Sequence, residues 1–200
     1  MIAVIDYGMG NLRSVQKAFE YLGFKAIITD DTDTVLNAES VVLPGVGAIS
    51  NALHRLTSRG MDKVIEEVIH QNKPFLGICL GMQLLFERSH EGGLFEGFKI
   101  INGEVVRLPY INGLKVPHMG WNRIIFGDDP LFYGLSESVY AYFVHSYYVG
   151  TSIAESIATT NYGIDVTAAV RKNKVYGVQF HPEKSGDVGL RILNNFGRMK

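Results

Sequence analysis

The stretch Lys73-Pro-Phe-Leu-Gly77-Ile-Cys79-Leu-Gly81-Met-Gln83-Leu-Leu-Phe-Glu87 decides the fold of this chain. Its first apolar residues predict a short buried strand, and the later ones recur at helical spacing. The strand residues are Phe75, Leu76 and Ile78, and the helix residues are Met82, Leu85 and Phe86. The sequence therefore predicts that a strand turns into a helix at Cys79.

Two glycines flank this cysteine. Gly77 and Gly81 form the pattern G-x-nucleophile-x-G, with sulfur in place of a serine oxygen. In so sharp a turn the strand and the helix cross closely, and a side chain at either glycine would collide with the other segment. The turn would hold the sulfur in a cleft at a helix N-terminus, where N–H groups favour a thiolate and can bind an oxyanion. The alternative is a small buried hydrophobic residue, which would have no need of the glycines.

Composition limits the class of protein. With 200 residues, 46% of them hydrophobic, residues 1–200 fit a single domain with a substantial core. The net charge of -1 gives no basic surplus for binding nucleic acid or an acidic membrane. One cysteine excludes an internal disulfide, and no apolar run is long enough to span a bilayer. We therefore expect a cytoplasmic protein.

Strands and amphipathic helices alternate in the first half of the sequence. Strands are predicted at residues 2–5, 24–28 and 41–43, and helices at residues 12–22, around 53–56 and at 61–69. This order predicts a parallel sheet covered on both faces, with its sites at the carboxyl ends of the strands. Short alternating runs after Gly93 predict antiparallel strands in the second half. A closing helix, capped at Ser185, is expected to end near residue 196.

Two glycine-rich turns follow buried strands. Gly8 and Gly10 begin a dinucleotide fingerprint, but Arg13 replaces its third glycine, so a tight turn at the mouth of a cleft is the favoured interpretation. The turn Pro44-Gly-Val-Gly47 can leave N–H groups free to bind an anion or an oxyanion. Taken alone, however, this second turn is better interpreted as a loop with permissive dihedral angles.

A second catalytic segment lies near the end of the chain, where a predicted strand at 175–180 delivers His181-Pro182-Glu183. Residues two apart on an extended chain face the same side, and the proline keeps His181 away from helical dihedral angles. The Glu183 carboxylate can orient the imidazole, which is left free to take a proton from a thiol. Such a pair is often only a surface pair at a strand end. Together with the cysteine turn it supplies nucleophile, base and orienting group.

Gly77-Ile-Cys79-Leu-Gly81-Met-Gln83, followed late in the chain by His181-Pro-Glu183, resembles the signature of the class I, or triad, glutamine amidotransferases. Three further segments resemble the glutaminase subunits of imidazole glycerol phosphate synthase within that family: residues 44–47, 117–122 and 142–147. The resemblance covers essentially the whole chain, and Ile49, where an aromatic residue is expected, is a minor departure. It implies an α/β, flavodoxin-like fold whose central sheet is mostly parallel, with helices on both faces and antiparallel additions.

The resemblance implies hydrolysis of L-glutamine to glutamate and ammonia through a cysteine thioester. The ammonia would pass to a cyclase subunit, HisF, which makes imidazole glycerol phosphate and an aminoimidazole carboxamide ribotide in histidine biosynthesis. Neither a cofactor nor a metal is implied. The implied catalytic residues are Cys79, His181 and Glu183, and the implied oxyanion donors are the N–H groups of Leu80, Val46 and Gly47. The implied substrate-binding residues are Gln83, Gly47, Ser146 and Tyr147, and the implied partner-facing residues are Asn11, Trp121, Tyr140, Tyr142 and Lys184.

Three other interpretations remain open from the sequence. The chain could be the glutaminase subunit of another amidotransferase, such as that of anthranilate or pyridoxal phosphate synthesis. It could be a cysteine peptidase or a γ-glutamyl hydrolase built on the same turn. It could also be a nucleotide-binding or scaffolding subunit in which Cys79 is inert. Every enzymatic interpretation requires that Cys79 and His181 meet in the folded chain.

Overall fold

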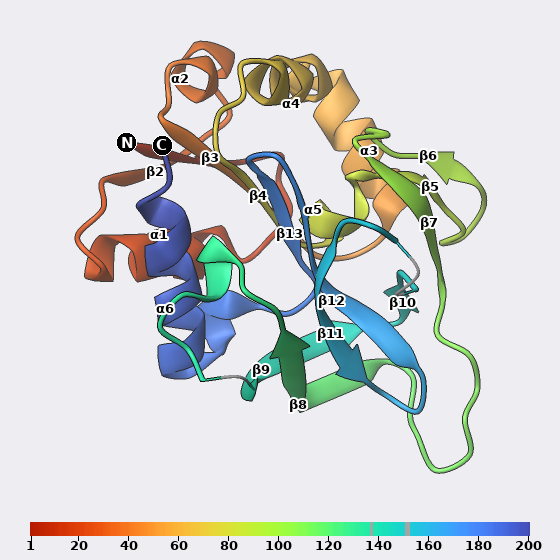
Figure 1. Cartoon of the computed structure of the whole chain (residues 1–200). Helices are drawn as coiled ribbons and strands as arrows, with labels where there is room; N and C mark the ends of the chain where they lie inside the picture. The colour runs from red at the N-terminus through yellow and green to blue at the C-terminus, as the bar shows by residue number, and fades with distance from the viewer. Residues whose placement is uncertain (137, 151–152) are drawn as a thin grey trace.

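The first half of the chain alternates strands and helices as the sequence predicts (Figure 1). The computed structural model describes residues 1–136, 138–150 and 153–200. In chain order the elements are β1 (Ile2–Ile5), α1 (Leu12–Tyr21), β2 (Ala26–Thr29), α2 (Thr32–Leu36), β3 (Ser40–Gly45), α3 (Ile49–Ser58), α4 (Met61–His70) and β4 (Phe75–Cys79). Strands dominate after the cysteine turn, in the order α5 (Leu80–Gln83), β5 (Phe86–Ser89), β6 (Phe95–Glu96), β7 (Ile101–Arg107), β8 (His118–Phe126), β9 (Ser138–His145), β10 (Tyr147–Tyr148), β11 (Ser156–Asn161), β12 (Asp165–Lys172), β13 (Val175–Val178) and α6 (Gly186–Gly197). Two 3₁₀ turns, η1 (Pro130–Phe132) and η2 (Pro182–Lys184), complete the list.

The main sheet changes character at β13. Among the described residues it has the strand order β2-β1-β3-β4-β13-β12-β11-β8-β9. The pairs from β2 to β13 are parallel, and the pairs from β13 to β9 are antiparallel. A smaller sheet has the order β10-β7-β5-β6. The predicted parallel sheet with antiparallel additions in the second half is therefore confirmed.

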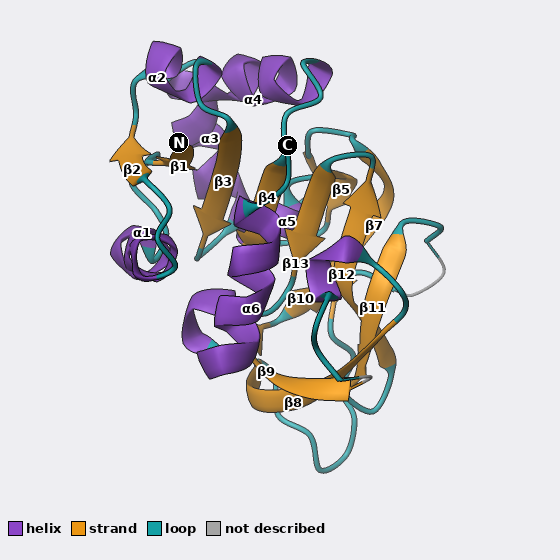
Figure 2. Ribbon diagram, turned by 60° about the vertical axis from the view of Figure 1, so that its left-hand side comes forward, coloured by secondary structure: helices purple, strands orange, loops and turns teal. Residues whose placement is uncertain are grey.

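Helices cover both faces of the parallel part of the sheet (Figure 2). Along β1, Val4 belongs to the core cluster that also contains residues of α1 and α6, whereas Ala3 and Ile5 belong to the cluster formed with α2, α3 and α4. Neighbouring residues of a strand point to opposite faces, so each central strand contributes to both cores. No helix in the described part of the chain has the length and apolar character needed to cross a membrane.

The two glycines beside the cysteine are required by close backbone contacts. A Cβ atom added at Gly81 would lie 1.9 Å from the carbonyl oxygen of Leu43, and one at Gly77 would lie 2.4 Å from the carbonyl oxygen of Gly81. Both distances are far below van der Waals contact, and both obstacles are backbone atoms. The steric reason inferred from the sequence is confirmed, and the crossing sets β3, β4 and α5 against one another.

The prediction of a helix after the cysteine is mostly wrong. The observed helix α5 ends at Gln83, and Phe86 begins strand β5. The carbonyl of Leu84 accepts a hydrogen bond from the N–H of Phe98 at 2.8 Å, and that of Leu85 accepts one from Ile100 at 2.9 Å. These partners come from a later segment that sequence periodicity does not reveal. Because every residue from Leu80 to Phe86 is buried, apolar spacing could not separate helix from strand here.

Two smaller differences concern helices α2 and α6. Helix α2 was not predicted, because it has only five residues. Asp31 caps it by accepting the N–H of Thr34 at 2.8 Å. Ser185 does not cap α6 as predicted. Its hydroxyl instead donates to the carbonyl of His181 at 2.7 Å and accepts the N–H of Tyr142 at 2.9 Å. Ser185 therefore joins the segment that carries the imidazole to β9.

Replacing Gly81 by alanine should destabilise the protein strongly. The new methyl group would overlap the Leu43 carbonyl, and neither backbone can move without breaking the pairing of β3 and β4. We expect Gly81→Ala to lower the free energy of unfolding by about 3 kcal/mol or more, measured by urea denaturation. Gly127→Ala is the matched control, because a Cβ there meets nothing within 4 Å, and its effect should stay within about 0.5 kcal/mol. Equal stabilities of the two variants would contradict the steric account.

Candidate active site

Cys79 occupies a strained turn at the carboxyl end of β4. Its φ of 55° and ψ of -106° are unusual for a residue with a side chain, and such strain costs of order 1–3 kcal/mol. In the sheet register Cys79 lies beside Gly45, so the turn Pro44-Gly-Val-Gly47 begins next to the sulfur. A Cβ on Gly45 would lie 2.8 Å from that of Leu80. The glycine thus lets the predicted oxyanion turn approach the nucleophile.

His181 and Glu183 reach the same place because β13 pairs in parallel with β4. The Nδ1 atom of His181 lies 2.9 Å from Oε1 of Glu183, and their side chains are 3% and 1% exposed. Pro182 opens a 3₁₀ turn, so the segment is not extended throughout as predicted, although the two side chains do meet. Within the described residues, Nε2 of His181 has no hydrogen-bond partner, and the imidazole lines the same cavity as the sulfur of Cys79. The meeting of thiol and imidazole on which the sequence argument depends is present.

The surroundings of His181 favour the imidazolium. Burial alone would lower the pKa of His181 from 6.5, but the adjacent Cys79 sulfur and Glu183 carboxylate outweigh burial and raise this pKa to about 10. A proton on His181 complements a negative sulfur. The surroundings therefore favour an imidazolium at His181, whose Nδ1 atom hydrogen-bonds Glu183.

The cavity in front of Cys79 has a volume of about 460 Å³, in the range of small-molecule sites. It is lined by the predicted residues Val46, Gly47, Cys79, Leu80, Gln83, Ser146, Tyr147 and His181. All the residues predicted to bind glutamine or its oxyanion therefore border one cavity. Glu183 lies behind His181 and does not line it.

Gln83 presents only its oxygen to the cavity. Its Nε2 atom donates to the carbonyl of Tyr147 at 3.0 Å and to Oε1 of Gln179 at 2.9 Å. Both amide hydrogens are thereby used inside the protein. The side chain can still accept a hydrogen bond, and this suits an ammonium group better than a carboxylate.

Sequence reasoning missed several residues at the site. Glu91 lines the cavity, and its carboxylate accepts the N–H of Ile49 at 2.9 Å, just beyond the glycine turn. An acidic residue directly before Gly92-Gly93 was the available signal. His145, Val144 and Pro117 also line the cavity, and fully buried Gln179 contacts Cys79 from behind it. Their positions depend on how the strands of the antiparallel half pair. The sequence predicted these strands but not their pairing register.

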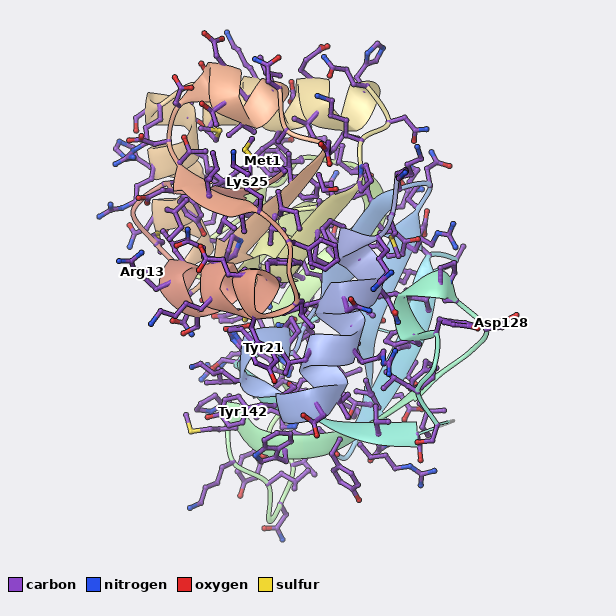
Figure 3. All side chains as sticks on the ribbon, turned by 90° about the vertical axis from the view of Figure 1, so that its left-hand side faces the viewer. Met1, Arg13, Tyr21, Lys25, Asp128 and Tyr142 are labelled. Carbon is purple, nitrogen blue, oxygen red and sulfur yellow. The ribbon has the colours of Figure 1, made fainter. Side chains whose placement is uncertain are left out.

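Most of the predicted partner-facing residues gather on the β8–β9 ribbon. Trp121 pairs with Tyr142 in the register, their rings are T-shaped at 6.2 Å, and Nζ of Lys184 lies 5.7 Å from the centre of the Tyr142 ring. Figure 3 shows Tyr142 beyond the end of α6. Trp121 and Tyr140 are more than half exposed. Asn11 differs from these, because its Nδ2 atom lies 3.5 Å from Oε1 of Glu183 and so contacts the triad.

The fold and the site define the class of this protein. The chain belongs to the class I glutamine amidotransferase family, whose model matches residues 3–199. Two solved structures share the fold: a glutamine amidotransferase with a TM-score of 0.76 at 17% identity, covering 100% of both chains, and PurLQS from Thermotoga maritima with a TM-score of 0.72 at 17% identity, covering 98% of this chain and 96% of the other.

Within that family the chain belongs with the HisH subunits of imidazole glycerol phosphate synthase. It is 54% identical to the HisH subunit of Caldanaerobacter subterraneus subsp. tengcongensis, over 100% of this chain and 98% of the relative. It is 50% identical to that of Geobacter sulfurreducens, over 100% of this chain and 99% of the relative.

The raised pKa of His181 predicts a pH-dependent contribution to stability. Between pH 6.5 and about 10 the folded state holds a proton on His181 that the unfolded state has released. The stability from this group is therefore complete below about pH 6.5 and is lost as the pH rises to about 10. We expect the difference in unfolding free energy between wild type and His181→Gln to shrink over that window in urea titrations. A difference that stays constant with pH would contradict the assignment.

Proposed function

We propose that this chain hydrolyses L-glutamine to glutamate and ammonia, as the glutamine amidotransferase subunit of imidazole glycerol phosphate synthase in histidine biosynthesis. The observation that carries the proposal is the meeting of Cys79, on its strained turn, with the buried His181–Glu183 pair at one cavity. Family membership and relatives of about half identity over the full length support the same activity.

The first step forms a thioester. The sulfur of Cys79 attacks the carbon of the glutamine side-chain amide, and the carbonyl oxygen becomes an oxyanion. The backbone N–H groups of Leu80, Val46 and Gly47 stabilise this oxyanion by donating hydrogen bonds to it. His181 gives its proton to the departing nitrogen, so that the C–N bond breaks and ammonia leaves.

The second step regenerates the thiolate. A water molecule enters where ammonia has left, and the neutral imidazole of His181 takes a proton from it as its oxygen attacks the thioester carbon. The C–S bond breaks, and glutamate leaves. Glu183 keeps the imidazole in one orientation in both steps, because its carboxylate accepts from Nδ1 and leaves Nε2 to exchange protons.

The cavity also offers groups for the amino-acid end of glutamine. The oxygen of Gln83 and the carboxylate of Glu91 supply acceptors for the α-ammonium group. Gly47, Ser146 and Tyr147 border the same space, and their backbone N–H groups are proposed to bind the α-carboxylate. Substrate recognition thus uses one residue of the short helix α5 and three other segments, which follow β3, β5 and β9.

The ammonia is proposed to pass to the cyclase subunit HisF across the face that carries Trp121, Tyr140, Tyr142 and Lys184. The exposed aromatic side chains support this, because aromatic residues with a polar end are enriched at protein interfaces. The chain acts as a single domain in the cytoplasm, where a lone catalytic cysteine stays reduced. Attachment of this face to the cyclase would set the orientation of the neighbouring active site.

Removing the sulfur should abolish glutaminase activity. We expect Cys79→Ala to lower glutamate release by at least about a thousandfold in the complex with the cyclase and its ligand, because no thioester can form. The measurement is glutamate and ammonia release with and without the cyclase. For wild type we expect release to rise sharply on addition of the cyclase and its ligand.

The same assay separates the other interpretations. A scaffolding subunit would show no glutaminase activity in any mixture, and a peptidase or γ-glutamyl hydrolase would gain nothing from the cyclase. Alkylation of Cys79 by a glutamine-analogue electrophile, with protection by glutamine, checks that the thiol is accessible from the cavity. Glutaminase activity retained in Cys79→Ala would overturn the proposal.

A further inference from the structure

Gln179 is a fully buried side chain that touches the nucleophile. It follows β13, two residues before His181, and is completely shielded from solvent. Its Nε2 atom lies 3.6 Å from the sulfur of Cys79, and its Oε1 atom accepts from Nε2 of Gln83 at 2.9 Å. A buried amide in contact with a reactive sulfur favours the ionised sulfur only if its nitrogen, rather than its oxygen, faces the sulfur.

A backbone carbonyl determines that orientation. The carbonyl of Tyr147 can only accept, and it faces the Gln83 side chain at 3.0 Å. The atom of Gln83 at that position must therefore be the nitrogen. The same nitrogen faces Gln179 at 2.9 Å, so the nearer atom of Gln179 must be its oxygen. The nitrogen of Gln179 must then face Cys79, because the hydrogen bonds of Gln83 fix the orientation of the Gln179 amide.

A second donor holds the Tyr147 carbonyl. Nδ1 of His145 lies 2.9 Å from it and must carry a hydrogen, so Nε2 of His145 accepts from Nδ1 of His118, also at 2.9 Å. Nε2 of His118 in turn faces Nδ2 of Asn122 at 3.2 Å. Both imidazoles are neutral near pH 7, because burial lowers the pKa of His118 and the pKa of His145 to about 4. With donors on two sides, the carbonyl that orients Gln83 is fixed.

We propose that Gln179 is a further catalytic residue, whose amide N–H stabilises the thiolate of Cys79 in the acylation step. The inference rests on the proposed function, since it assigns the sulfur as nucleophile. Hydrogen bonds to a charged partner are stronger than those to a neutral one, so this contact favours the ionised sulfur. The carbonyl of Val144, 3.9 Å from the sulfur, can accept only from the neutral thiol. Gln179 therefore offsets a neighbour that favours the unreactive form.

Other titratable groups also surround the sulfur, and they are unchanged in the test. They are His181 and Glu183 on the segment after β13, His145 on β9, Tyr7 after β1, and Glu91 after β5. Gln179→Met replaces none of these groups and introduces no charge. The effect of the amide can thus be measured against a constant background.

The test uses the single thiol of the chain. In Gln179→Met the amide is lost and the side-chain length is kept. We expect the pH of half-maximal alkylation of Cys79 by iodoacetamide to rise by about one unit, and alkylation well below that pH to become about tenfold slower. Glutaminase kcat/KM with the cyclase should fall by a similar factor. Gln179→Glu keeps the acceptor for Gln83 and replaces the donor by a negative charge, so its shift should be larger.

Thr160→Val is the matched control. It removes another buried hydrogen bond, which the Thr160 hydroxyl donates to the Arg123 carbonyl, and Thr160 does not line the cavity. Its alkylation profile should equal that of wild type. If Gln179 only fills space, Gln179→Met would loosen the site and leave the alkylation rate unchanged or faster. Either result, in Gln179→Met or in folded Gln179→Glu, would overturn the inference.

The two proposals fail separately. Glutaminase activity in Cys79→Ala would overturn the proposed function and this inference with it. An inactive Cys79→Ala combined with a wild-type alkylation profile and wild-type activity in the Gln179 variants would overturn this inference alone.

Discussion

The contact between the backbone of Gly81 and the carbonyl of Leu43 is the constraint on which the site depends. It allows α5 to cross β3 at a distance that no side chain would permit. The crossing places Cys79 beside Gly45, so the predicted oxyanion turn lies at the nucleophile without any long loop to position it. Catalytic geometry here follows from close main-chain packing.

The site carries two features that reduce stability. Cys79 has a positive φ, and the second carboxylate oxygen of Glu183 lacks a hydrogen-bond partner within the described residues. Unfavourable features of this kind persist only where the surrounding structure enforces them. The two core clusters on either face of the parallel strands supply that enforcement.

The sequence could predict those parts of the structure that depend on neighbouring residues. The cysteine turn and the His-x-Glu segment are short patterns with a local steric or electronic reason, and both were found. Phe86 was assigned to a helix because of its apolar spacing. In the structure it begins a strand, because it pairs with Ile101 of the later strand β7. Gln179 was missed because its contact with Cys79 arises from sheet register, which leaves no pattern in the chain. Glu91 was missed although it precedes Gly92-Gly93, because only the folded chain brings it to the cavity. Prediction from the sequence therefore failed where a feature depends on contacts between residues far apart in the chain, and not where it depends on the chemistry of a short segment.

The proposed partner face and the catalytic base share one set of backbone hydrogen bonds. The N–H of His181 donates to the carbonyl of Tyr142 at 2.8 Å, and the hydroxyl of Ser185 bridges back from the N–H of Tyr142 to the carbonyl of His181. The side chain of Tyr142 meanwhile lies against Trp121 and Lys184. A displacement of β9 by a bound protein would therefore move the imidazole relative to Cys79, because β4 is held by the parallel half of the sheet. Strand β13, parallel to β4 and antiparallel to β12, is where these two halves meet.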